Sequence, residues 1–206
     1  MSLDLGALFL TYGAIFLVEL PDKTFLATLV LATRYRPILV WIGVGAAFTV
    51  QTAVAVVLGQ AVSFLPDLVV KVAAAVLFLI GAVLLFREAR SHQLAHQQGE
   101  DDDAGEEYAA KAAPAQGFRA VVASFLVLFA AEWGDLSQLL TISLVARYDA
   151  PLEVFIGALA ALLTVSGLAV IAGSTLMRFV PLHLLFYLGG TVCLVLEALL
   201  IYEILS

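Results

Sequence analysis

Long apolar runs alternate with short polar breaks along the whole chain. Six runs reach the length of at least about 17 residues that a membrane-crossing helix needs. They cover residues 5–32, 38–65, 69–86, 121–146, 154–177 and 182–202. The runs lack the period-two alternation of membrane β-strands. The pattern therefore predicts an all-α polytopic membrane protein with six transmembrane helices.

A polar motif interrupts the first run near its centre and occurs again in the fourth run. Residues 19–24 (ELPDKT) are matched 113 residues later by residues 132–138 (EWGDLSQ). Glycines also recur, since Gly81 in the third run corresponds to Gly190 in the sixth. We interpret the chain as a duplicated three-helix unit, with repeat one at 1–90 and repeat two at 118–206. Because each unit has an odd number of spans, the two copies are expected in opposite orientation, as in many secondary transporters.

The segment between the repeats differs sharply from them in composition. Residues 91–117 are rich in acidic and small residues and have few apolar anchors. Such a composition predicts a solvated, disordered linker. Lys and Arg are unequally shared between alternate loops, with seven on the side of the linker and two on the other side. The positive-inside rule then predicts a protein of the cell membrane with a cytoplasmic linker and both termini outside.

Composition agrees with a membrane protein and excludes some partners. The chain is 63% hydrophobic and 13% charged, with a formal net charge of −7. Basic residues do not cluster along the sequence, so we expect no nucleic-acid partner. The lipid bilayer is the expected environment of the apolar helices. A single cysteine, Cys193, excludes an intramolecular disulfide. The oligomeric state stays open, and a homo-oligomer is compatible with the sequence.

Four carboxylates stand in the middle of apolar runs, where each costs roughly 2.5–3.5 kcal/mol if ionised and unpaired. They are two Glu-x-x-Asp pairs, Glu19 with Asp22 and Glu132 with Asp135. Residues three apart share a helix face, and two inverted repeats bring both faces to the membrane midplane. The expected site therefore has four carboxylates as cation ligands. Supporting polar groups are expected from Thr24, Ser137, Gln138 and the tethered ammonium of Lys23.

These side chains offer oxygen ligands, which suit hard divalent cations such as Ca²⁺ and Mn²⁺. Crowded carboxylates cannot all stay ionised without a cation, so metal entry should expel protons. The sequence therefore predicts a transporter that exports a divalent cation in exchange for protons. We expect no enzymatic activity and no permanently bound cofactor, with Mn²⁺ or Ca²⁺ and H⁺ as transported ions. The residues do not decide between Mn²⁺ and Ca²⁺, nor do they give the proton stoichiometry.

The paired motifs resemble the Glu-x-Gly-Asp-(Lys/Arg)-(Thr/Ser) signatures of small divalent cation/proton antiporters. This family occurs in Golgi, chloroplast and bacterial membranes and was formerly called uncharacterised protein family sixteen. The resemblance covers nearly the whole chain and implies Mn²⁺ or Ca²⁺ exchange against protons, with the acids of both motifs as ligands. Pro21 departs from the first glycine of the signature, and Leu136 departs from the second basic residue.

Two other functions use the same acids. Asp22 and Asp135 on two helices resemble the shared-proton pair of an intramembrane aspartyl protease. An exporter of a cationic solute would also need buried carboxylates. A separate feature is the pair His92 and His96, four residues apart, which is either a weak metal-sensing patch or part of a solvated linker.

Overall fold

The structure is a computed structural model, and it describes residues 4–20, 22–98, 116–179 and 182–205. The described residues form helices joined by short turns, which confirms the all-α prediction for that part of the chain. The helices are α1 (Leu5–Glu19), α2 (Lys23–Arg34), α3 (Pro37–Val62), α4 (Asp67–Gln98), α6 (Phe118–Ala131), α7 (Leu136–Tyr148), α8 (Pro151–Phe179) and α9 (Leu182–Leu205).

The first apolar run, which the sequence predicts as one helix kinked by Pro21, is two helices. Helix α1 ends at Glu19, and α2 begins at Lys23 with Asp22 as its N-cap in an extended backbone conformation. A proline at position 21 has no N–H to continue the hydrogen-bond ladder, and Asp is a favoured N-cap residue. Glu19 and Asp22 therefore lie on either side of a helix break and not on one helical face.

The fourth run breaks at the equivalent place. Helix α6 ends at Ala131 and α7 begins at Leu136, with a bend of 71° between them. Gly134 in this turn has φ +80°, a conformation that glycine adopts without steric cost. In both breaks the Asp N–H donates to the Glu carbonyl, at 3.0 Å for Asp22 and 3.1 Å for Asp135. The predicted continuous helix over 121–146 is thus wrong in the same way as the first.

Helix α4 is longer than predicted. It continues to Gln98, so residues 91–98, the first part of the predicted linker, are helical. The Tyr187 hydroxyl of α9 donates to Gln93 Oε1 at 3.0 Å, which fastens this extension to the second half of the molecule. Most of the remaining linker, residues 99–115, lies outside the described residues.

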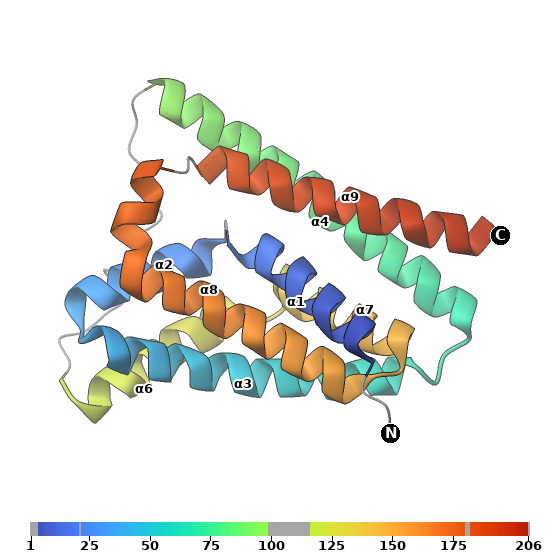
Figure 1. The fold of residues 1–206 in the computed structure, drawn as a ribbon, viewed down its shortest axis with the longest axis horizontal. Coiled ribbons are helices and arrows are strands. Elements are labelled where there is room, and N and C mark those ends of the chain that lie inside the picture. The colour runs from blue at the N-terminus through green and yellow to red at the C-terminus, as the bar shows by residue number, and fades with distance from the viewer. Residues whose placement is uncertain (1–3, 21, 99–115, 180–181, 206) are drawn as a thin grey trace.

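The helices run back and forth along the long axis of the molecule (Figure 1). Helix α1 begins and α9 ends at one end of the molecule, whereas α4 ends and α6 begins at the opposite end. Helices α4 and α9 pack along each other on one side. The broken helices lie against the long ones, with α1 and α2 on α8 and with α6 and α7 on α3.

Two glycines mark equivalent close contacts in the two halves. A Cβ placed on Gly157 of α8 would lie 2.6 Å from the Leu8 carbonyl oxygen of α1. A Cβ on Gly43 of α3 would clash in the same way with the Val121 carbonyl oxygen of α6. Val121 follows Leu8 by 113 residues and Gly157 follows Gly43 by 114. In each half a glycine therefore lets a long helix pack closely against the broken helix of the other half: α8 against α1, and α3 against α6.

Several described helices have the dimensions of membrane spans. Three helical segments are long and apolar enough to cross a membrane: α3, residues 68–91 of α4 and residues 151–171 of α8. The bent pair α6–α7 makes a fourth if the two helices together form one span. Helix α1 is apolar but has only 15 residues. The six-span count, the inverted repeat and the domain boundaries stay predictions.

Candidate cation site

Three of the four predicted carboxylates meet where the two helix breaks face each other. One carboxylate oxygen each from Glu19, Glu132 and Asp135 lies within 4.8 Å of the other two. Glu19 is the last residue of α1, and Glu132 and Asp135 bracket the turn between α6 and α7. Two oxygens that bind one Ca²⁺ at about 2.3–2.6 Å can be at most about 5 Å apart, so this group has the span of a single cation site.

Burial makes the ionised form of these carboxylates costly unless a cation or protons neutralise their charge. Glu19 is 1% exposed and Glu132 is 3% exposed. Glu19 Oε1 has no hydrogen-bond partner among the described residues. The carboxylates clustered with Glu19 are those of Glu132 and Asp135, which carry the same sign. Because ionised carboxylates repel in such surroundings, the group is suited to hold either a divalent cation or protons.

Asp22, the fourth predicted ligand, has a structural task and is not part of this three-carboxylate group. Its Oδ2 accepts from the backbone N–H of Thr24 at 3.5 Å, as an N-cap of α2. The buried Thr24 hydroxyl lies 3.1 Å from Glu19 Oε2 and 3.4 Å from Asp22 Oδ2. A hydroxyl has one proton to donate, so Thr24 serves one carboxylate at a time and links Asp22 to the site.

The side-chain amide of Gln138 stabilises the turn in the second motif. Gln138 Oε1 accepts from the backbone N–H of Gly134 at 2.8 Å, which closes the turn between Glu132 and Asp135. The Thr141 hydroxyl donates to the Ser137 carbonyl one turn along α7, at 2.8 Å. The predicted supporting residues Ser137 and Gln138 therefore lie beside Glu132, and Gln138 holds the loop in shape.

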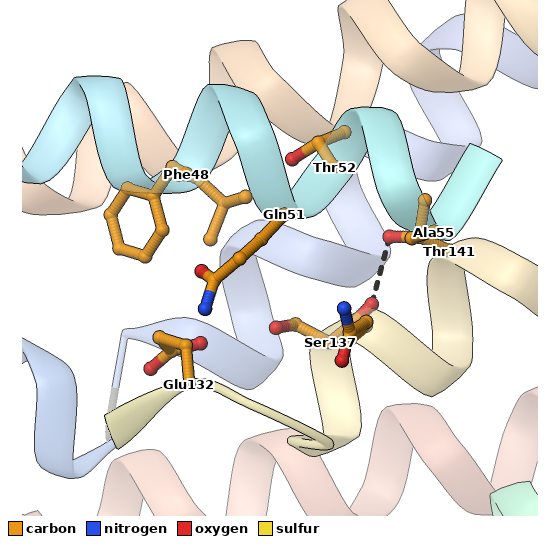
Figure 2. Close-up of a pocket in the computed structure, with 9 residues that line it drawn as sticks. Phe48, Gln51, Thr52, Ala55, Glu132, Ser137 and Thr141 are labelled. Atoms are coloured by element: carbon orange, nitrogen blue, oxygen red, sulfur yellow. Dashed lines mark hydrogen bonds between the residues drawn. The ribbon is translucent and has the colours of Figure 1, made fainter. Parts of the chain in front are cut away.

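The structure adds two polar residues that the motif search missed, Gln51 and Thr52 of α3. Both are buried and line a pocket of about 10 Å³ beside Glu132 (Figure 2). That volume accommodates about one water molecule. Gln51 stands at the middle of the apolar run 38–65, so the midplane argument applied to the acids could have found it. The pocket is lined by Phe48, Gln51, Thr52, Ala55, Glu132, Ser137, Gln138, Thr141 and Leu162.

Three other predicted residues receive no structural test. Lys23 is the first residue of α2, but its side chain lies outside the described residues. The side chains of His92 and His96 do as well, although both residues are within α4. The roles suggested for Lys23 and for the histidine pair stay predictions.

Comparison with known proteins adds independent information. A family model described as "Divalent cation/proton antiporter GDT1" matches residues 7–93 and 120–206. These two segments include both motifs and leave out residues 94–119, which contain most of the acidic linker. No solved structure matches the chain significantly.

Curated relatives include proteins of a cyanobacterium and of plants. The chain is 36% identical over 186 residues to a GDT1-like protein of Synechocystis sp., which covers 84% of this chain and 89% of the relative. It is 32% identical over 221 residues to the chloroplastic protein PAM71 of Arabidopsis thaliana, covering 98% of this chain and 60% of that protein. A chloroplastic GDT1-like protein 1 of Oryza sativa subsp. indica is 29% identical over 222 residues, with 98% of this chain and 65% of the relative covered. The chain thus spans less than two thirds of these plant proteins.

Proposed function

Since the chain belongs to the GDT1 family of divalent cation/proton antiporters, we propose that it exchanges Mn²⁺ or Ca²⁺ for protons at the group formed by Glu19, Glu132 and Asp135. The family is one of membrane transporters and not of enzymes, so the protease alternative is set aside. The exporter of a cationic solute is set aside for the same reason. The single observation that carries the proposal is the convergence of three carboxylates from both motifs within 4.8 Å.

The choice of Mn²⁺ or Ca²⁺ rests on ligand chemistry. The group offers oxygen ligands, and neither the single cysteine nor any of the three histidines belongs to the motifs. Mg²⁺ binds oxygens at about 2.0–2.1 Å in strict octahedral geometry and keeps several waters. A group with a span of up to 4.8 Å, in which Glu19 and Glu132 are buried and Asp135 is partly buried, fits a larger, more adaptable cation better.

The exchange follows from the cost of buried charge. With a cation bound, the carboxylates are neutralised, and with protons bound they are neutral themselves. The empty ionised site is the costly state, so reorientation without a load is disfavoured. Loading a cation on one side therefore releases protons there, and loading protons on the other side releases the cation.

The membrane arrangement that we propose has two inverted repeats of three spans, with α1–α2 and α6–α7 each as one broken span. The back-and-forth course of the helices and the paired glycine contacts support it. Breaks at mid-span are typical of transporter binding sites, where backbone polar groups line a cavity. The Lys and Arg bias supports a protein of the cell membrane with the linker in the cytoplasm and both termini outside.

Transport by the purified protein in sealed vesicles tests the proposal. The vesicles contain a pH-sensitive dye, and Mn²⁺, Ca²⁺ or Mg²⁺ is added outside under an outward proton gradient. We expect Mn²⁺ or Ca²⁺ to accelerate proton efflux, with Mg²⁺ much less effective. Equal efflux with and without each cation, in protein shown to be folded, would contradict the proposed exchange.

A further inference from the structure

The pocket beside Glu132 has an equivalent place in the other half of the molecule, beside Glu19. Residues of the broken helices correspond at an offset of 113, and residues of α3 and α8 correspond at an offset of 114, as the contacts of Gly43 and Gly157 show. Hydroxyl residues of the pocket correspond to buried hydroxyl residues of the other half, in the pairs Thr52 and Ser166, Ser137 and Thr24, and Thr141 and Thr28. The two halves therefore place similar polar side chains on the two sides of the cation site.

The space beside Glu19 differs from the pocket because Phe25 fills it. Phe25 follows the first motif at the position that Gln138 has in the second motif. Its side chain is 2% exposed and forms a small apolar cluster with Val165 and Ala169. The members of this cluster are the equivalents of three residues that line the pocket, Gln138, Gln51 and Ala55. Where the second half has room for about one water, the first half therefore has a phenyl ring.

Buried oxygens in this part of the first half lack a hydrogen-bond partner among the described residues. They include Thr28 Oγ1 and Glu19 Oε1. The equivalent of Thr28 is Thr141, which lines the pocket and donates to the Ser137 carbonyl. Because buried polar groups normally have a protein or water partner, an unpaired hydroxyl is costly. By the same correspondence, Thr28 would line a water-filled space if the ring of Phe25 moved away.

Both spaces reach the cation site, and they lie on opposite sides of it. Glu132 lines the pocket, and Thr24, the residue before Phe25, has its hydroxyl 3.1 Å from Glu19 Oε2. Helix α7, which carries the pocket residue Thr141, leads toward the end of the molecule where α1 begins (Figure 1). Helix α2, which carries Phe25, leads toward the end where α4 ends and α6 begins. The ring therefore fills the side of the site that faces this second end.

An exchanger with alternating access opens its site to one side of the membrane at a time. We propose that Phe25 closes the cation site on the side where α4 ends and α6 begins, and that the site opens there when the ring leaves its apolar cluster. The hydroxyls of Thr28 and Ser166 then line a hydrated path to Glu19. This inference rests on the proposed function, because it names the residue that closes one side of that site.

The reactivity of a thiol at position 28 tests the inference without requiring transport. Cys193→Ser removes the single cysteine, and Thr28→Cys then places one thiol on the filled side of the site. A charged methanethiosulfonate reagent reacts with the hydrated thiolate, so the labelling rate of the purified full chain reports water at this position. We expect Phe25→Ala to raise that rate at least about tenfold, because local opening costs less free energy when fewer apolar contacts must break.

The matched control is Phe78→Ala in the same background. Phe78 of α4 is also 2% exposed, but it belongs to a different apolar cluster. The control should leave the labelling rate at position 28 unchanged. If Phe25→Ala does not purify as a folded protein, Phe25→Leu takes its place, with Phe78→Leu as its control and the same direction of change expected.

Two results would overturn the inference. The first is a labelling rate at position 28 that is the same with phenylalanine and with the smaller residue at position 25. The second is an increase for the Phe78 variant as large as for the Phe25 variant, because a general loosening of the packing would then explain both.

Labelling and exchange fail separately. A wild type that does not exchange divalent cations for protons would contradict the proposed function. The labelling rates would still decide whether Phe25 closes this side of the carboxylate group, because they do not depend on transport.

Discussion

Replacing Glu19 by glutamine removes one of the three clustered carboxylates and keeps the size of the side chain. Glu19 is 1% exposed, and one oxygen each of Glu132 and Asp135 lies within 4.8 Å of its carboxylate. Removing one partner from a buried charge interaction costs about 3–5 kcal/mol. At about 1.4 kcal/mol for each factor of ten, cation affinity should fall by roughly 10²-fold to a few times 10³-fold.

The same substitution should not destabilise the cation-free protein. It removes a like charge from the neighbourhood of Asp22 and Asp135, so the crowding of negative charge is relieved. We therefore expect an unchanged or higher thermal unfolding temperature without metal, together with a strongly raised Kd. A raised Kd with an unchanged or higher unfolding temperature would show that the protein lost a cation ligand and not its fold.

The assay is calorimetric titration with Mn²⁺ and with Ca²⁺, accompanied by thermal unfolding of the same samples. Glu153→Gln is the matched control, because Glu153 lies in the first turn of α8 and is not one of the clustered acids. It should leave the Kd unchanged. A Glu19→Gln protein that binds the preferred ion within about threefold of the wild type, a difference of about 0.7 kcal/mol, would refute the three-carboxylate site.

Three further predictions follow from the same geometry. Asp135→Asn should weaken cation binding at least about tenfold more than Asp22→Asn, because Asp135 belongs to the clustered group and Asn can still cap α2; equal losses in titration would contradict this. Gly43→Ala and Gly157→Ala should each destabilise the protein by about 1–3 kcal/mol through equivalent overpacking, whereas Gly13→Ala, whose Cβ would have no atom within 4 Å, should not lower the unfolding temperature. The affinity for Mn²⁺ should fall as the pH is lowered from about 8 to about 6, because protons compete for the carboxylates that bind the metal; a Kd independent of pH would contradict proton coupling.

Hydropathy and the repeated motif predicted much of this architecture from the sequence. The apolar runs correctly gave an all-helical chain, and the resemblance of the two motifs gave the family. Both signals depend on composition and spacing, which the sequence displays directly. The same runs gave the approximate ends of α3 and α8, but not the breaks within the first and fourth runs or the extension of α4 to Gln98.

The helix breaks were harder to predict because they fall inside apolar segments. Residues on both sides of Glu19 and of Glu132 are apolar, so a hydropathy window does not register the interruption. The local signals were Pro21 and Gly134, together with an Asp that follows each at a favoured N-cap position. Reading these as helix ends would have placed Asp22 as a cap, which is the role that the structure gives it.

Gln51 was missed for a different reason. The acids stand out because a charge in mid-span is costly and because they occur in both motifs, whereas Gln51 is a neutral amide that is not repeated in the corresponding helix. Its contact with Phe129, 78 residues away in sequence, depends on how α3 packs on α6. Long-range packing of this kind is not visible in the pattern of a single helix.

The central claim is that one buried group of carboxylates holds either a divalent cation or protons. The number of protons released for each Mn²⁺ bound, measured by calorimetry in buffers of different ionisation enthalpy, tests it most directly. We expect the wild type to release at least one proton per Mn²⁺ bound, and Asp135→Asn to release fewer. Tight Mn²⁺ binding with no proton release across the pH range would contradict the claim, because the cation would then bind to carboxylates that are already ionised.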